Sequence, residues 1–303
     1  MNVSTLVKEG TKIIDGKQHS ADILAEIKQK TRILTEKTGL KPGLATILVG
    51  NDPASHLYVT IKRKKARELG FQDFHQSLPA TISEKDLINH INDFNLNDRV
   101  HGILVQMPLP DPIDTENVIS SLNPRKDVDG FHALNIGSLF RAYTENVIAP
   151  CTPAGIMEIL RREAIDPAGK HVVIIGRSNL VSKPLAAMLL QNNNHHQLGG
   201  NAAVTVIHSG VTNIHHFTSQ ADILIAAVGK PHFITAPMVK SASIIIDVGI
   251  NKLKNGTIVG DVDFMNVLPK VRKITPVPGG VGPMTIAALM QNTFKIFKNN
   301  YNF

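Results

Sequence analysis

Tyr58 and Lys62 lie four residues apart in a segment, residues 53–69, whose pattern predicts a helix that ends at Gly70. This spacing places both side chains on one face of the helix, one turn apart. A phenol beside an amine can orient a substrate and hold or move a proton. The spacing also suits a packed tyrosine and a solvated lysine, because Lys62 begins the basic run KRKKAR and most such runs are solvated helix faces.

Gln106 follows a predicted buried strand, residues 100–105, and precedes the sequence MPLP. Ligands of open α/β sheets bind beyond the carboxyl ends of strands, so Gln106 is a candidate for contact with a substrate. The prolines that follow would make this wall rigid, because the proline ring fixes a backbone angle. A loop glutamine with no binding role is the alternative.

Asp127 and Asp129 lie two residues apart in the sequence PRKDVDG. Two acids at this spacing could bind a metal ion, but the sequence offers no further His or carboxylate cluster nearby with ligand spacing. We therefore predict no metal site and favour a carboxylate that binds the N–H groups of a substrate. Two solvated loop acids are the alternative.

The segment 276–285, PVPGGVGPMT, is rich in proline and glycine. It predicts a constrained surface with few side chains, which allows the backbone to approach a flat ligand closely. A structural crossing between two domains is the alternative, and both roles can hold together.

Gly176 follows the apolar run HVVII and precedes a predicted helix. Such a junction can bind a dinucleotide, because the amides from Arg177 to Ser182 could receive a pyrophosphate near the helix N-terminus. A strict GxGxxG pattern is absent, since Ser178 occupies the position of the second glycine. An ordinary turn in a doubly wound sheet is therefore the alternative.

The next predicted strand ends at His208 and Ser209, with no Asp or Glu. A carboxylate there would bind a ribose 2′-hydroxyl and favour NAD. Ser209 and the fork of donors on Arg177 could instead receive a 2′-phosphate, so the sequence favours NADP. A solvated surface arginine is the alternative for Arg177.

Predicted strands alternate with helices along the chain, which indicates βαβ units and a parallel sheet. The fold class is therefore α/β, with an irregular domain boundary at residues 142–153. The expected strands are residues 44–49, 74–78, 100–105, 171–175, 203–208, 223–227 and 244–248. The expected helices are residues 20–38, 53–69, 84–94, 183–190 and 285–298, and the polar run 191–200 is expected to be a loop.

The composition is typical of a globular protein: 303 residues, of which 43% are hydrophobic and 19% charged. The single cysteine, Cys151, excludes an internal disulfide and weakly favours a reducing compartment. No secretory signal or membrane span is apparent, so we expect a soluble, cytoplasmic protein. The net charge of +7 suits phosphate-bearing or polycarboxylate ligands as well as nucleic acid, but the absence of Trp argues against nucleic-acid stacking.

These segments together resemble the bifunctional methylenetetrahydrofolate dehydrogenase/methenyltetrahydrofolate cyclohydrolase family, from about residue 15 to residue 290. Eight motifs in the right order carry the resemblance: YVTIK at 58–62, QMPLP at 106–110, KDVDGF at 126–131, PCTPAG at 150–155, GRS at 176–178, DVGIN at 247–251, GDVDF at 260–264 and PGGVGPMT at 278–285.

The resemblance implies oxidation of 5,10-methylenetetrahydrofolate by NADP⁺, followed by hydrolysis to 10-formyltetrahydrofolate. It implies that Lys62 is the catalytic lysine, that Tyr58 stacks on the substrate, that Gln106 bonds to the lysine and that Asp129 holds the pterin. The remaining implied substrate contacts are Val105, Met107, Pro278, Gly279, Gly280, Val281 and Thr285. The implied cofactor contacts are Gly176, Arg177, Ser178, Ser209 and Ile250.

The resemblance also implies two domains with a cleft between them. Residues 1–149 would form a folate-binding catalytic domain, onto which the helix 284–303 packs back, and residues 150–283 would form a Rossmann-like NADP-binding domain. Members of the family are usually homodimers. We expect tetrahydrofolate derivatives as substrates and no nucleic-acid or membrane partner.

An amine that is protonated at neutral pH is a poor base, but burial or a nearby cation would favour its neutral form. We therefore expect Lys62 to activate water directly or through Tyr58. The sequence departs from the family pattern at Ser182, where a glycine is usual, and this hydroxyl could crowd the pyrophosphate or bond to it. The run 191–200 also looks longer than usual. The rival functions are a monofunctional enzyme of the same family, a shikimate-type dehydrogenase and a nucleic-acid-binding protein.

Overall fold

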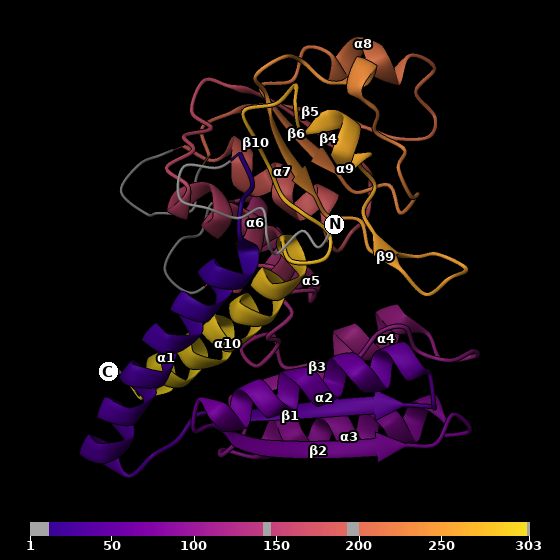
Figure 1. Ribbon diagram of the computed structural model, residues 1–303. Coiled ribbons are helices and arrows are strands. Elements are labelled where there is room, and N and C mark those ends of the chain that lie inside the picture. The colour runs from indigo at the N-terminus through magenta and orange to yellow at the C-terminus, as the bar shows by residue number, and fades with distance from the viewer. Residues whose placement is uncertain (1–11, 142–146, 193–199, 302–303) are drawn as a thin grey trace. The chain divides into compact units, whose positions relative to one another are not determined.

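The computed structural model describes residues 12–141, 147–192 and 200–301 (Figure 1). The chain divides into two compact units, each of which contains one parallel sheet. The three-stranded unit comprises residues 22–138, 147–151 and 286–301, and the five-stranded unit comprises residues 12–21, 139–141, 152–192 and 200–285.

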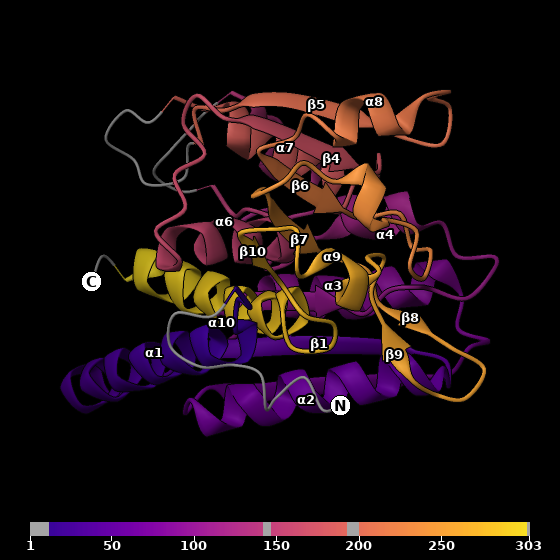
Figure 2. The same cartoon turned by 45° about the horizontal axis from the view of Figure 1, so that its top comes forward.

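The three-stranded unit is built on a parallel sheet in the order β2-β1-β3. Its strands are β1 (Gly43–Val49), β2 (Gln72–Leu78) and β3 (Gly102–Val105). β1 is buried along its whole length, because its side chains alternate between two covered faces. Figure 2 shows α2 (Pro53–Glu68) and α3 (Glu84–Leu96) on opposite faces of this sheet. Because β1 and β3 pair in parallel, their carboxyl ends lie together at one edge of the sheet.

Local sequence signals set the helices of this unit. Asp52 caps α2 by accepting the amide of Ser55 at 2.7 Å, and Pro53 occupies the first turn, where its missing N–H is not needed. Ser83 caps α3 by accepting the amide of Asp86 at 3.1 Å. The short helices are α4 (Thr115–Ser121) and α5 (Ala133–Phe140). The long helices α1 (Gly16–Thr38) and α10 (Val281–Asn300) each begin in the five-stranded unit and continue into this one.

The five-stranded unit has a wholly parallel sheet in the order β10-β7-β6-β4-β5. Its strands are β4 (His171–Ile175), β5 (Ala203–Ile207), β6 (Ile223–Ala226), β7 (Ile244–Asp247) and β10 (Lys273–Ile274). The chain passes from β4 to β5 on one side and then crosses to β6 on the other. The carboxyl end of β4 is therefore the point where the strand order reverses, and open α/β sheets bind their ligands at that point.

The other elements of this unit connect the strands. They are α6 (Cys151–Arg162), α7 (Ser182–Leu190), α8 (Ile214–Thr218), the 3₁₀ helix η2 (Ala236–Met238), α9 (Phe264–Val267) and an antiparallel pair, β8 (Asn251–Lys252) with β9 (Ile258–Val259). None of the described helices is both long enough and apolar enough to span a membrane.

The α/β class is confirmed, and every helix and strand expected from the sequence is present, with bounds that differ by up to four residues. The largest differences are at the starts of α1 and α10, which each begin four residues earlier than expected. Gly282 and Pro283 are tolerated in the first turn of α10, where amides need no partner within the helix, so the helix can begin at Val281. The expected irregular boundary ends at Cys151, which opens α6. Residues 142–146 of that boundary and residues 193–199 of the expected loop lie outside the described residues.

Candidate functional site

The loop from β1 into α2 places Tyr58 and Lys62. Gly50 adopts a φ of 80°, a left-handed conformation that suits glycine, and the chain then turns into the capped start of α2. Tyr58 is 38% exposed, so part of its side chain is accessible, whereas Lys62 is partly buried. The two residues share one side of the helix, one turn apart.

Lys62 and Gln106 are brought together by the fold. The Lys62 Nζ donates to Gln106 Oε1 at 3.0 Å, and Gln106 Nε2 donates to the carbonyl of Met107 at 2.7 Å. The second bond orients the side-chain amide, so its oxygen is the atom that faces the lysine. The Gln106 backbone amide also joins β1, by donating to the carbonyl of Ile47 at 2.9 Å. Val105, the last residue of β3, is buried in the core of this unit, and Met107 packs against the same core.

Asp127 and Asp129 have different surroundings. Asp127 is buried and accepts the amides of Gly130 at 3.0 Å and His132 at 2.8 Å, as well as the side-chain amide of Asn135 at 2.9 Å. Its carboxylate therefore holds its own loop. Asp129 makes no such backbone bond in the part of the chain that the structure describes, which leaves it as the carboxylate that a ligand can use.

Asp129 lies in the electrostatic field of Lys62, although the two form no direct ion pair. Burial raises the pKa of the Asp129 carboxyl, while the charge of Lys62 and a hydrogen bond from the Cys151 thiol oppose that rise. The Cys151 thiol also donates to the carbonyl of Val128 at 3.3 Å. Burial, together with the charge of Asp129, raises the pKa of this thiol well above its usual range, so it stays protonated and acts as a donor.

A buried asparagine on α10, which the sequence did not indicate, also holds this turn in place. Asn292 on α10 is buried and donates to the carbonyls of Val128 at 2.9 Å and Ala149 at 3.0 Å. Gly130 adopts a φ of 71°, and a side chain there would meet the backbone at Ala149. Only the motif PCTPAG hinted that Cys151 belongs near the site. No local pattern could have identified Asn292, because it lies 164 residues from Val128.

The three-stranded unit therefore presents an amine, an oriented amide, a carboxylate and an accessible phenol ring near one edge of its sheet. An amine fixed by an amide oxygen can position water or exchange a proton with it, and a carboxylate can bind paired N–H groups. The phenol ring can stack on a flat ligand. The arrangement suits acid–base chemistry on a flat, nitrogen-rich molecule.

In the five-stranded unit, Gly176 follows β4 at the edge where a dinucleotide would bind. Its φ is 136°, and a side chain there would overlap the carbonyl oxygen of Ala227 and lie 2.7 Å from Ser182 Oγ. Only glycine fits this position. The amides from Arg177 to Leu180 have no hydrogen-bond partner among the described residues, so the turn is able to receive a phosphate group.

At the start of α7, two of the amides that were expected to bind a phosphate group already have a hydrogen-bond partner. Ser178 Oγ accepts the amides of Val181 at 3.1 Å and Ser182 at 3.4 Å, which are therefore already engaged. Ser182 is fully buried, and its Oγ has no hydrogen-bond partner in the described part of the chain. This buried hydroxyl lies close to Gly176, 2.7 Å from where a side chain there would begin.

Arg177 and Ser209 follow neighbouring parallel strands and are both exposed. The two turns are linked by the Gly176 amide, which donates to the carbonyl of Ile207 at 2.8 Å. The turn at Ser209 is closed by His208 Nδ1, which accepts the amide of Gly210 at 3.1 Å. A hydroxyl and a guanidinium thus follow adjacent strands at one edge of the sheet.

Ile250 and the glycine-rich segment at 278–285 also come together in this unit. Ile250 is 52% exposed after β7, and its Cδ1 lies 3.9 Å from where a side chain at Gly282 would begin. Pro278 is exposed, whereas Gly279, Gly280 and Val281 are buried. Thr285 is held by Thr152, with 3.0 Å between the two hydroxyl oxygens. The second half of this segment is the first turn of α10.

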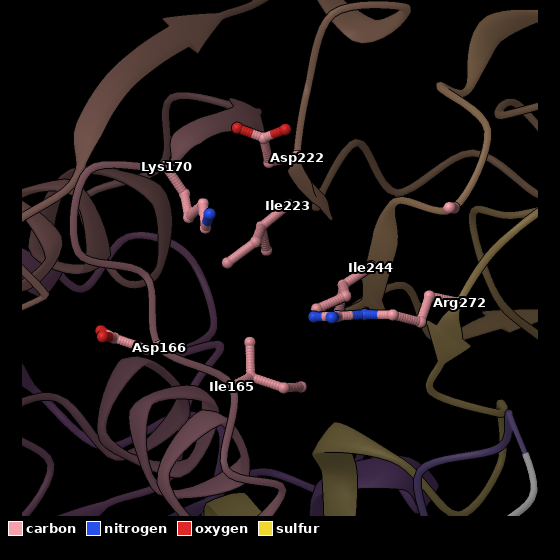
Figure 3. A pocket seen from close by; sticks show the side chains of 8 residues that line it. Ile165, Asp166, Lys170, Asp222, Ile223, Ile244 and Arg272 are labelled. Carbon is pink, nitrogen blue, oxygen red and sulfur yellow. The ribbon is translucent and has the colours of Figure 1, made fainter.

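A small pocket of about 150 Å³ lies at the opposite edge of the same sheet (Figure 3). Its lining includes residues at the amino ends of the strands, namely Lys170, Ile223, Ile244 and Arg272. Because dinucleotides bind at the carboxyl ends of such strands, we assign this pocket no part in cofactor binding.

Both halves of the chain match models of one protein family. Residues 14–129 match the catalytic domain of tetrahydrofolate dehydrogenase/cyclohydrolase, and residues 150–301 match its NAD(P)-binding domain. The chain belongs to this family. The resemblance drawn from eight short motifs is thereby confirmed.

Relatives of this family are similar over nearly the whole chain. A bifunctional protein FolD of Campylobacter curvus is 50% identical over 288 residues, which cover 95% of this chain and 96% of the relative. The crystal structure of a FolD methylenetetrahydrofolate dehydrogenase/cyclohydrolase from Campylobacter jejuni is 46% identical, with a TM-score of 0.90 over 96% of this chain and 99% of that one. A Trypanosoma brucei FolD structure, in complex with NADP and an inhibitor, is 33% identical, with a TM-score of 0.89 over 97% and 99% of the two chains.

A shikimate 5-dehydrogenase from Listeria monocytogenes shares the fold at 13% identity, with a TM-score of 0.51 over 86% of this chain and 93% of that one. At this identity the likeness concerns the fold alone. The shikimate-type rival therefore gains no support beyond a shared architecture.

Proposed function

We propose that this chain oxidises 5,10-methylenetetrahydrofolate to 5,10-methenyltetrahydrofolate with NADP⁺ and hydrolyses the product to 10-formyltetrahydrofolate, with Lys62 activating water. The observation that carries the proposal is the Lys62–Gln106 pair, joined at 3.0 Å in the electrostatic field of Asp129, in a chain of this family.

The dehydrogenase step removes a hydride, the hydrogen nucleus with its bonding electron pair, from the one-carbon bridge of the substrate. NADP⁺ supplies the hydride acceptor when bound. The bridge carbon becomes an amidinium-like cation, so no proton needs to be abstracted. The protein's contribution is therefore to orient the substrate and exclude water. Tyr58 stacks on the flat substrate, and Asp129 accepts hydrogen bonds from the pterin N–H groups.

The cyclohydrolase step adds water to the cationic carbon. Lys62, acting as the neutral amine, takes a proton from the water as the new C–O bond forms and becomes an ammonium. The bond from that carbon to one folate nitrogen then breaks, and the nitrogen receives a proton, which leaves the formyl group on the other nitrogen. Gln106 Oε1 fixes the Lys62 amine, so the amine faces a defined position. The proton passes from water to Lys62 directly or through Tyr58.

The other proposed substrate residues come from two segments of the chain. Val105, Gln106 and Met107 supply the carboxyl end of β3. Pro278, Gly279, Gly280, Val281 and Thr285 supply a surface with few side chains, to which a flat ring can come close. We keep the functional division of the chain into a folate domain, residues 1–149 with 284–303, and a cofactor domain, residues 150–283.

The cofactor residues are Gly176, Arg177, Ser178, Ser209 and Ile250. The unpaired amides of the Gly176 turn bind the pyrophosphate, and Arg177 with Ser209 receives the 2′-phosphate, which favours NADP over NAD. A homodimer and a cytoplasmic location stay predictions from the sequence.

The test follows two products at once in the wild-type chain. Methylenetetrahydrofolate is supplied with NADP⁺ and, in parallel, with NAD⁺, while the reduced nucleotide and the methenyl compound are recorded at separate wavelengths. We expect faster turnover with NADP⁺ and continued loss of the methenyl compound after its formation. Methenyl accumulation without hydrolysis would identify a monofunctional dehydrogenase, and equal rates with NAD⁺ would contradict the role of Arg177 and Ser209.

A further inference from the structure

The carboxylate of Asp261 is buried and binds three consecutive backbone amides. Its Oδ2 accepts the amides of Val228 at 2.7 Å and Gly229 at 2.9 Å, and its Oδ1 accepts the amide of Lys230 at 3.0 Å. Oδ1 also accepts the side-chain amide of Asn251 at 2.9 Å. Asp261 is 0% exposed, so all four bonds form out of contact with water.

A second buried carboxylate, Asp247, holds Asp261 in turn. Asp247 Oδ1 accepts the amides of Asp261 at 3.0 Å and Gly249 at 2.9 Å, and its Oδ2 accepts the amide of Val262 at 2.9 Å. The Asp247 amide donates to Thr275 Oγ1 at 2.7 Å. The motifs DVGIN and GDVDF are therefore one hydrogen-bonded network.

The glycines of both motifs leave room for these carboxylates. A side chain at Gly249 would overlap the Asp261 carboxylate, and one at Gly260 would overlap that of Asp247. The backbone is thus packed directly against the two acids. A buried carboxylate is costly unless its oxygens are fully hydrogen-bonded, so this arrangement needs a reason beyond filling the core.

The segments that Asp261 holds lie at the ligand-binding edge of the sheet. Residues 228–230 follow β6, and the carbonyl of Ala227, just before them, faces Gly176. Asn251 directly follows Ile250, the exposed apolar residue assigned to the cofactor. Asp261 therefore fixes the loops after β6 and β7, next to the turn that follows β4.

Consecutive amides in a turn form a concave anion site of their own. In residues 228–230 this site is filled by Asp261, so the loop cannot take a phosphate group. The amides of the Gly176 turn are left as the anion site of this edge. The buried acid thus both shapes the loop and directs the pyrophosphate to one place.

We propose that Asp261 is a positioning residue for NADP⁺ binding, which holds residues 228–230 and Asn251 in the arrangement that the dinucleotide requires. The proposal rests on the proposed function in one respect, the placement of the cofactor at the carboxyl edge of this sheet.

The test is Asp261→Asn, with Asp263→Asn as the matched control. An amide nitrogen cannot accept a hydrogen bond, so either orientation of the substituted side chain would deprive two of the four donors of an acceptor. Asp263 lies two residues further on and bonds only Asn266 with its side chain among the described residues. The three readouts are the Kd for NADP⁺ by titration calorimetry, hydrogen exchange of residues 228–230 without cofactor, and hydrolysis of preformed methenyltetrahydrofolate without cofactor.

We expect Asp261→Asn to weaken NADP⁺ binding at least tenfold and to speed exchange at residues 228–230, while cofactor-free hydrolysis stays within twofold of wild type. Asp263→Asn should stay within twofold in all three. Unchanged NADP⁺ affinity in Asp261→Asn would overturn the proposal, as would a parallel loss of hydrolysis, which would indicate a general structural role.

If Asp261→Asn does not fold, Asn251→Ala removes one donor to the same carboxylate and should weaken NADP⁺ binding by a smaller factor of about three. Unchanged affinity in that variant would then overturn the proposal. Failure of the wild-type chain to bind NADP⁺ would instead contradict the proposed function, so the two failures are distinguishable.

Discussion

Acid should destabilise this protein through His101, a histidine just before β3. Its ring is 2% exposed, and its Nδ1 accepts the Gly43 amide at 2.9 Å, so this nitrogen carries no proton. The ring also packs edge-on against Phe297, with centroids 5.0 Å apart. Burial, with a smaller effect of the Lys126 charge, lowers the pKa of His101 to about 4.

The size of the effect follows from the difference between the folded and unfolded states. The unfolded chain binds a proton at His101 near pH 6.5, whereas the folded chain resists it until about pH 4. The stabilising contribution is therefore complete above pH 6.5 and is lost as the pH falls. Linkage gives a loss of about 2 kcal/mol by pH 5 and about 3 kcal/mol by pH 4.

The assay is urea unfolding between pH 7 and pH 4 for the wild type, for His101→Gln and for His90→Gln as control. His90 lies partly exposed on α3 and makes none of the contacts of His101. We expect His101→Gln to be less stable at pH 7 but to lose about 3 kcal/mol less than wild type on acidification. Identical pH dependence in the wild type and His101→Gln would refute the reasoning.

Three further substitutions test other contacts. Lys126→Met removes an ammonium that donates to the carbonyls of Phe94, Asn95 and Asn97 at the C-terminal end of α3. This substitution should lower the free energy of unfolding by about 2 kcal/mol in urea titrations, and an unchanged free energy would contradict the expectation. Ser182→Ala removes a buried hydroxyl without a hydrogen-bond partner among the described residues and should raise the free energy of unfolding by about 1 kcal/mol. A lower free energy of unfolding would show that the hydroxyl has a partner. Asn292→Leu removes the amide donor to the Ala149 carbonyl and leaves the Val128 carbonyl with the Cys151 thiol as its donor, so it should cost about 2–4 kcal/mol and slow methenyl hydrolysis; unchanged hydrolysis would contradict its role near Asp129.

Periodicity and turn residues were enough to predict the main strands and helices, because buried parallel strands are apolar runs and helix starts carry capping signals. The same rules failed where proline and glycine occur inside helices. α6 contains Pro153 in its first turn and Gly155 where Met284 comes within 3.1 Å of a side-chain position. In a sequence, proline and glycine usually indicate the end of a helix, but here their positions within α6 are explained by the helix start and by close packing.

Part of the site was predictable from general rules. Gln106 was expected at a carboxyl strand end, and the helix spacing put Lys62 on one face with Tyr58. The contact between Lys62 and Gln106 needed the fold, since 44 residues separate them. The supporting residues Asn292 and Asp261 could not be found from local patterns, because their partners come from distant segments.

The most direct test of the central claim is the hydrolysis of preformed methenyltetrahydrofolate by Lys62→Met, with no nucleotide present. Lys64→Met, on the exposed side of the same helix, is the matched control, because its side chain is 70% exposed. We predict that Lys62→Met hydrolyses the compound about 100-fold more slowly than wild type or worse, while Lys64→Met retains the wild-type rate. Hydrolysis at the wild-type rate by a folded Lys62→Met protein would contradict the assignment of Lys62 as the group that activates water.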